Sequence, residues 1–250
     1  MNKDLRMKTA FTLAEVLITL GIIGIVSAMT IPTLINNYQK KVTVAKLQKV
    51  HAVLNQIARL AVANDSIKGY TAGQEVTAEK TEEFFNEFIF SQLKSPKVIS
   101  KGSDIYTSCE SNLTDYCYRR LNGTYHDESI RTLFDNGRAF FIVNDENLYY
   151  IYNYRWDIKY DEEGNVVERT LRYITNSKAY VDINGSSGPN ILGKDIFIFT
   201  IDFDKGSAYP MGYTSEINTI NSICSKSGTG LYCAEKIRRD GWQIKDDYPW

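Results

Sequence analysis

The pattern of apolar and polar positions sets residues 11–35 apart from the rest of the chain. These residues form a nearly uninterrupted apolar run that contains a single charged residue, Glu15. A helix of about 25 residues rises about 37 Å, which is enough to cross a hydrocarbon core of about 30 Å. The run therefore predicts a membrane-spanning helix close to the N-terminus.

Beyond Pro32 the pattern becomes amphipathic. Apolar residues recur at spacings of three and four and so share one helix face: Leu47, Val50, Val53, Leu54, Ile57, Leu60 and Ala61. No further Gly or Pro occurs before Gly69, so we expect one helix over residues 11–64, about 80 Å long. Pro32 is expected to bend it because the ring removes a backbone hydrogen bond. The second half, residues 36–64, should pack on a soluble domain.

The remaining residues, 65–250, predict an α+β domain in which an antiparallel sheet covers the amphipathic helix. A second helix is expected from about Thr77 to just before Pro96. Short aromatic and β-branched segments then predict strands: GRAFFIV, NLYYIYNY, VVERTLRYI, KAYVDI and KDIFIFTIDF. A hairpin turn is expected at Gly164–Asn165. Alternation in the last segment places four residues on one face: Phe197, Phe199, Ile201 and Phe203.

Charge and motif content narrow the functional classes. The chain has 250 residues, 29 basic and 30 acidic side chains, and a net charge of −1, so we expect no nucleic-acid partner. It contains no serine-hydrolase, zinc-protease, P-loop or dinucleotide-binding motif. We therefore predict that the protein is not an enzyme, and an anchored hydrolase is the weakest alternative.

Four cysteines fall into two close pairs, Cys109 with Cys117 and Cys224 with Cys233. Both pairs lie in polar, turn-rich sequence, and neither has the two-residue spacing typical of zinc sites. We predict two local disulfides and therefore an oxidising compartment. Other pairings and free thiols in a cytosolic protein are the alternatives.

A late Gly-rich segment, YVDINGSSGPNILGKDIF, offers four side chains with oxygen donors: Asp182, Asn184, Asn190 and Asp195. Calcium takes six to eight oxygen ligands, including amide and backbone carbonyl oxygens, so a Ca²⁺ site is a candidate here. The alternative is a turn that uses Asp, Asn, Gly and Pro for backbone reasons alone. Because the spacing does not match an EF-hand, we favour the turn.

The segment AFTLAEVLITLGIIGIVSAMTIP, preceded by a short basic stretch, resembles the N-terminus of type IV prepilins and of type II secretion pseudopilins. The resemblance covers about residues 8–35 and implies that residues 1–10 are a leader. A prepilin peptidase would cut between Ala10 and Phe11, and the new N-terminus would be methylated. The family usually has Gly before the cut, and this chain has Ala10.

Cleavage at that point makes Glu15 the fifth mature residue, the position at which the family carries a Glu. Gly24 and Pro32 also fall where the family commonly places Gly and Pro. In assembled filaments of this family, the Glu is thought to meet the free N-terminal amine of a neighbouring subunit. Because a buried carboxylate is costly unless it is paired, Glu15 would set the register of assembly.

The resemblance implies a structural subunit of a pseudopilus or pilus with a pilin-like fold. It would sit in the bacterial inner membrane with its C-terminal domain outside the cytoplasm. Its partners would be other pilin or pseudopilin subunits, prepilin peptidase, the inner-membrane assembly machinery and the lipid bilayer. Major pseudopilins also bind calcium in a late loop, which supports the candidate site. The alternative is a membrane-anchored extracytoplasmic binding or adhesion domain that does not polymerise.

Overall fold

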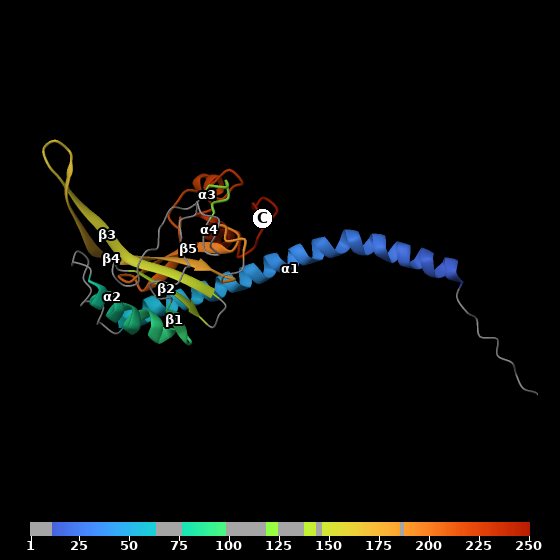
Figure 1. Ribbon diagram of the computed structural model, residues 1–250, viewed down its shortest axis with the longest axis horizontal. Coiled ribbons are helices and arrows are strands. Elements are labelled where there is room, and N and C mark those ends of the chain that lie inside the picture. Colours follow the sequence, from blue (N-terminus) through green and yellow to red (C-terminus); the bar gives the residue numbers. More distant parts are fainter. Residues whose placement is uncertain (1–11, 64–76, 99–118, 125–137, 144–146, 186–187) are drawn as a thin grey trace, which may run out of the picture. The chain divides into compact units, whose positions relative to one another are not determined.

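One helix, α1 (Leu13–Ala63), contains both the apolar run and the amphipathic stripe (Figure 1). It belongs to a computed structural model that describes residues 12–63, 77–98, 119–124, 138–143, 147–185 and 188–250. The helix continues through Pro32 without interruption. The chain divides within it into two units, Met1–Val42 and Thr43–Trp250.

The amphipathic stripe is the part of α1 that packs into a core. The buried residues of the helix are Thr43, Leu47, Val50, Leu54, Ile57, Ala58 and Ala61, which confirms the predicted spacing. Val53 and Leu60 are partly buried at the edge of the stripe. The ring of His51 stacks on Phe199 of the sheet, with 6.0 Å between centroids.

The second predicted helix is present and changes its helical form toward its end. α2 (Ala78–Phe84) continues as a π-helical turn at Phe85–Ile89 and a 3-10 turn at Phe90–Gln92. Thr77 caps its start, because the Thr77 hydroxyl accepts a hydrogen bond from the amide of Lys80. Its buried aromatic side chains extend the core, and the ring of Phe84 meets that of Phe203 edge to face at 5.5 Å.

In the described part of the chain, six antiparallel strands form one sheet in which each strand pairs with the next along the chain. They are β1 (Pro96–Val98), β2 (Arg138–Val143), β3 (Asn147–Tyr160), β4 (Val166–Asp182), β5 (Ile196–Asp202) and β6 (Ser207–Pro210). The predicted hairpin is confirmed: β3 and β4 meet through a turn in which Asp161 N–H donates to Asn165 O at 3.0 Å. The turn requires Gly164, whose φ is +85°.

Two strand predictions need correction. VVERTLRYI and KAYVDI are parts of the single strand β4, because β3 and then β5 pair along its length. The alternation in β5 suggests that one face of the strand is buried, but both faces are. Phe197, Phe199, Ile201 and Phe203 are buried on one face, and the alternating residues on the other face are buried as well: Ile196, Ile198, Thr200 and Asp202. Neither β1 nor β6 was expected from the sequence.

The edge strand β6 is completed by side chains of α1. The Asn55 side chain donates to Ala208 O at 3.1 Å and accepts from Ala208 N–H at 3.0 Å, as a neighbouring strand would. His51 Nε2 lies 3.0 Å from the same carbonyl. These contacts attach the sheet edge to the helix and satisfy backbone groups that would otherwise be open.

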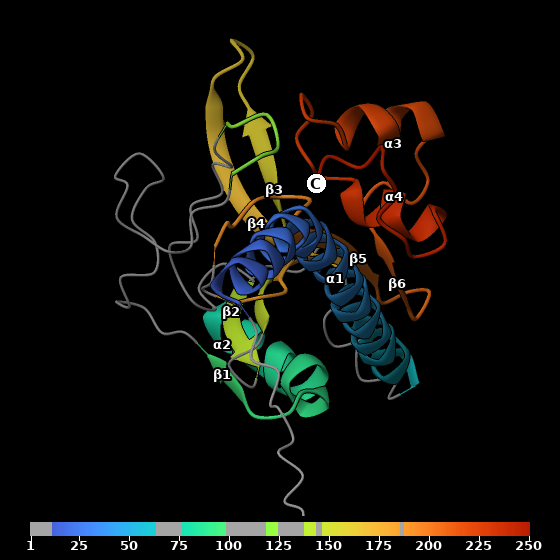
Figure 2. The same ribbon diagram turned by 90° about the vertical axis from the view of Figure 1, so that its right-hand side faces the viewer.

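Two short helices, α3 (Ile217–Ile223) and α4 (Cys233–Arg239), lie together near β5 (Figure 2). The Cys224–Cys233 disulfide joins them, which confirms this predicted pairing. Cys109 and Cys117 lie outside the described residues. A β-carbon at Gly193, whose φ is +87°, would lie 2.7 Å from Cys233 Sγ, so only Gly fits beside the disulfide.

Replacing both Cys224 and Cys233 with Ala is expected to lower the free energy of unfolding by about 2–3 kcal/mol. The disulfide closes a short loop, with a sequence separation of 9, and so restricts the unfolded chain. Urea unfolding of the full-length chain in detergent micelles measures the change. Lys226→Ala, an exposed substitution inside the same loop, is the matched control and should leave the midpoint unchanged. Equal midpoints for all three chains would contradict the prediction.

Candidate functional site

The N-terminal half of α1 exposes apolar side chains that belong to no hydrophobic core in the described part of the chain. No residue from Leu13 to Val42 is buried within the chain. Ile18, Leu20 and Ile22 are 62%, 60% and 57% exposed. Among the described residues, α1 is the one helix long and apolar enough to cross a membrane, judged by length and composition. Apolar surface of this extent needs lipid or other helices around it.

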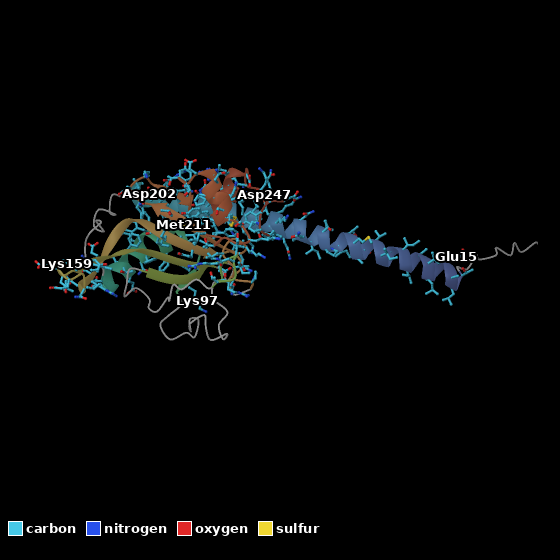
Figure 3. All side chains as sticks on the ribbon, turned by 90° about the horizontal axis from the view of Figure 1, so that it is seen from above. Glu15, Lys97, Lys159, Asp202, Met211 and Asp247 are labelled. Carbon is cyan, nitrogen blue, oxygen red and sulfur yellow. A yellow bond between two sulfur atoms is a disulfide. The ribbon has the colours of Figure 1, made fainter. Side chains whose placement is uncertain are left out.

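Glu15 lies at the first turn of α1 (Figure 3) and takes part in a capping box with Thr12. Its carboxylate oxygen Oε2 accepts from the Thr12 amide at 2.9 Å and from the Thr12 hydroxyl at 2.8 Å. In return, the Thr12 hydroxyl accepts from the Glu15 amide at 3.2 Å. This pair satisfies amides that a helix start leaves open.

The capping box gives Glu15 a local role that sequence reasoning missed, although the Thr-x-x-Glu signal was present. The local role accounts for one carboxylate oxygen, Oε2. A carboxylate at a helix N-terminus also interacts favourably with the helix dipole. A test of any assembly role must therefore separate the charge of Glu15 from its capping hydrogen bonds.

Of the other residues predicted for processing and assembly, the structure describes two, Gly24 and Pro32. Gly24 and Pro32 both lie inside the exposed half of α1, and a β-carbon at Gly24 would meet nothing within 4 Å. Ala10 and Phe11 lie outside the described residues.

The four residues of the predicted calcium site lie together where β4 connects to β5: Asp182 ends β4, and Asn184, Asn190 and Asp195 lie in the loop that follows. The Asp182 carboxylate oxygen Oδ1 accepts from the Asn184 amide at 3.0 Å. The two oxygens of Asp195 accept from the amides of Asn190 and Ile191, each at 2.7 Å. The Asn184 side chain donates to Gly188 O at 3.1 Å and reaches Asp195 Oδ2 at 3.5 Å. The loop is therefore held by its own acidic side chains, as the turn interpretation predicts.

Buried oxygen atoms remain that the turn does not use. Asp182 is 0% exposed and Asp195 is 5% exposed. Within the described part of the chain, Asp182 Oδ2 and Asn184 Oδ1 are buried without a hydrogen-bond partner. Buried polar atoms are normally satisfied, so two such oxygens in one loop indicate a missing partner.

The two carboxylates of the loop are buried in surroundings that disfavour their charged form. Burial, together with the nearby Asp195, raises the pKa of Asp182 to about 8, against the effect of its hydrogen bond to Asn184 and of Lys46. Burial also raises the pKa of Asp195. The ammonium of Lys46 donates to Ile183 O at 2.8 Å, beside the loop. A divalent cation would stabilise both carboxylates in their charged form.

The side chains of this site offer oxygen donors, the type that Ca²⁺ prefers, but fewer than the six to eight ligands that Ca²⁺ takes. Asp182 and Asn184 would hold the ion through their unpartnered oxygens, with Asp195 supplying charge nearby. The described residues contain no group of three or more His, Cys, Asp or Glu side chains suited to a metal. Backbone carbonyls and water would have to complete the six to eight ligands that calcium takes.

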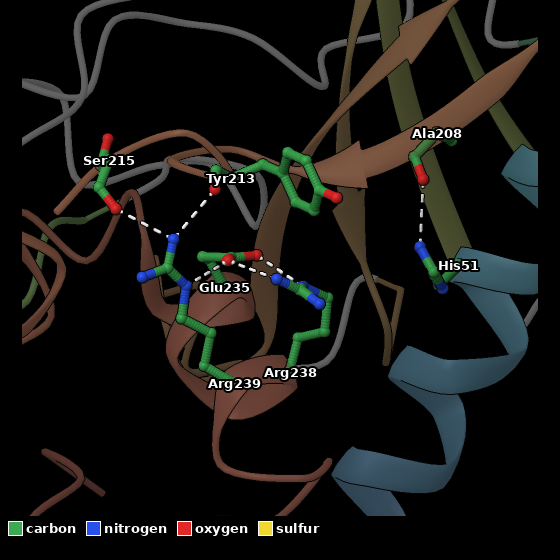
Figure 4. A network of polar contacts seen from close by, with 7 residues as sticks. All are labelled: His51, Ala208, Tyr213, Ser215, Glu235, Arg238 and Arg239. Carbon is green, nitrogen blue, oxygen red and sulfur yellow. Dashed lines mark hydrogen bonds and ion pairs between the residues drawn. The ribbon is translucent and has the colours of Figure 1, made fainter. Parts of the chain in front are cut away.

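A second polar cluster, which the sequence did not suggest, surrounds Glu235 of α4 (Figure 4). Glu235 is fully buried and binds Arg238 and Arg239, each at 2.7 Å. Arg239 also donates to the carbonyl oxygens of Tyr213 and Ser215, each at 2.9 Å. Glu235 holds the two arginines, and Arg239 links them to the loop before α3, so we assign the cluster a structural role.

Comparison with protein-family models, with curated proteins and with solved structures gives no match to this chain. Its function therefore has to be inferred from two features, the exposed apolar half of α1 with Glu15 at its start and the loop from Asp182 to Asp195.

Proposed function

We propose that the chain is a structural subunit of a pilus-like or secretion-type filament with a pilin-like fold. The observation that carries the proposal is the exposed apolar half of α1, which has one carboxylate at its first turn and no buried residue from Leu13 to Val42. Lipid would surround this half before assembly, and the same half of neighbouring copies would surround it afterwards. The C-terminal α+β domain would remain outside the cytoplasm, in agreement with its disulfide.

Two interactions would hold the proposed filament together. Neighbouring helices would bury their apolar surfaces against one another, and Glu15 would pair with a positive group. Leaving lipid for a helix bundle gains close packing, and a small residue such as Gly24 allows helices to approach. A carboxylate in the bundle is tolerated where it meets a positive group. A free N-terminal amine, produced by cleavage before Phe11, would supply such a group at the same end of the helix as Glu15.

The intact mass of the mature protein tests this function. We expect the chain purified from cells with an active prepilin peptidase to lack residues 1–10 and to carry one added methyl group on Phe11. The same chain from cells without that peptidase is the control and should keep its full length. A full-length mass in both cells would overturn the proposal and favour a membrane-anchored domain that does not polymerise.

We further propose that the loop from Asp182 to Asp195 binds calcium in this subunit. The specific observation in its favour is the pair of buried, unpartnered oxygens, Asp182 Oδ2 and Asn184 Oδ1, next to a second buried carboxylate. A cation there would fix the connection between β4 and β5.

A further inference from the structure

The hairpin of β3 and β4 extends beyond the rest of the sheet as a two-stranded ribbon (Figure 1). Pairing of β3 with β2 ends at Tyr152, and pairing of β4 with β5 ends at Asn176. Past these points, within the described residues, β3 and β4 pair only with each other, up to Tyr160 and Val166. No strand among the described residues pairs with either outer edge of this part, and a lone two-stranded ribbon is marginally stable in water.

The end of this ribbon exposes apolar side chains on one face. Ile158 and Tyr160 of β3 are 39% and 59% exposed, and Val166 of β4 is 41% exposed. Tyr160 pairs with Val166, and Ile158, two residues earlier in β3, lies on the same face and pairs with Arg169. A register shift between Lys159 and Tyr160 leaves Val167 outside this pairing. The opposite face carries an ion pair between Lys159 and Glu168, and Val167 at the register shift is 62% exposed. An amphipathic ribbon with an exposed apolar face is suited to docking.

The charge of the ribbon end is acidic. Residues 157–169 contain five carboxylates and two cationic side chains: Asp157, Asp161, Glu162, Glu163, Glu168, Lys159 and Arg169. Asp161 holds the turn by accepting from the amides of Glu163 and Asn165, so the turn presents Glu162 and Glu163 to solvent. A docking partner for this surface should combine apolar side chains with positive charge.

Residues 34–41 of α1 have that combination. Leu34, Ile35 and Tyr38 are 70%, 49% and 68% exposed. The only charged residues of the segment are Lys40 and Lys41, both positive. The preceding part of α1, residues 13–33, also exposes apolar side chains but contains no basic residue.

We infer that the ribbon end of one copy docks on residues 34–41 of α1 in a second copy of this chain. The inference rests on the proposed function, because a filament brings the helices and domains of many copies together. Tyr160, Ile158 and Val166 contact the exposed apolar residues of the helix, and the acidic turn faces Lys40 and Lys41. Such a contact is sensitive to salt, since its charges are near solvent.

Cysteine cross-linking between two full-length copies tests the contact directly. One copy carries Glu162→Cys and the other carries Lys41→Cys, and the two are produced together in cells with an active prepilin peptidase. We expect a mixed disulfide between these sites at a yield roughly tenfold above a control pair, because docking raises the effective concentration of the two thiols. The matched control replaces Lys41→Cys with Lys226→Cys, at another exposed lysine.

Pelleting of filaments from the same cells separates the two proposals. Filaments without the Glu162–Lys41 cross-link overturn the docking contact and leave the filament function standing. Absence of both filaments and cross-link overturns both. Charge reversal supplies an independent check: the pair Glu162→Lys and Glu163→Lys should lose the contact, and combining it with Lys40→Glu and Lys41→Glu in the partner copy should restore it.

Discussion

Replacing Glu15 with Gln is expected to reduce pelleted filaments to background while membrane insertion stays normal. Gln keeps the size of Glu and can still accept the capping hydrogen bonds from Thr12, but it carries no charge. Removing a charge from the apolar run does not hinder insertion. In the proposed filament the charge is needed where the carboxylate meets the amine of a neighbouring copy, so its loss should act on assembly. Membrane fractionation and filament pelleting measure the two steps separately.

Thr12→Ala is the matched control for this experiment. It removes the hydroxyl that donates to Glu15 at 2.8 Å and accepts from the Glu15 amide at 3.2 Å, while the charge remains. The helix start should weaken, and filaments should still form. If Thr12→Ala abolishes filaments and Glu15→Gln does not, Glu15 acts as a cap alone and the register role is wrong.

The stability of the C-terminal domain without divalent cations is expected to fall as the pH rises from about 4 to about 8. Asp182 has a pKa of about 8 in the folded chain, whereas an unfolded Asp ionises near about 3.9. Between these values the folded state holds a proton that the unfolded state has released, so rising pH favours unfolding. The full loss is on the order of 5 kcal/mol, at about 1.4 kcal/mol per pH unit. Urea unfolding of the full-length chain in micelles at a series of pH values measures it.

Calcium should reverse this loss, because a cation replaces the proton on Asp182. At pH 8, millimolar calcium is expected to raise the unfolding midpoint, and Asp182→Asn is expected to flatten the pH dependence and abolish the response to calcium. Asn keeps the shape of Asp, so the variant tests the charge. Asp195 retains its own raised pKa and leaves a smaller slope. Calorimetry that detects no binding at millimolar calcium would remove the site.

Much of the fold was readable from local patterns. The stripe from Leu47 to Ala61 was found because helical spacing follows from backbone geometry alone. The cap at Thr77 and the turn at Gly164 were found because their chemistry lies within a few residues. The extent of β4 was missed, since Asn176 and Ser177 resemble a break and are held in the strand by pairing with β5.

The candidate sites show the same division. The sequence places Asp182, Asn184, Asn190 and Asp195 within one short segment, but the pattern alone does not distinguish a turn from a cation site. Burial supports the proposed cation site, because it leaves Asp182 Oδ2 and Asn184 Oδ1 without partners and raises the pKa of Asp182. The cluster around Glu235 was out of reach, because two of its contacts are to carbonyl groups more than twenty residues away.

By itself the sequence determined the long helix, its apolar first half, its amphipathic second half and the antiparallel sheet of the C-terminal domain. These features depend on side-chain periodicity and on turn residues that are close together along the chain. Only the tertiary structure decided that both faces of β5 are covered, how Asn55 completes the edge at Ala208, and that the β3–β4 ribbon extends past its neighbours. The physical reason is that burial and strand pairing join residues far apart in the sequence, and no local pattern records which of them will meet.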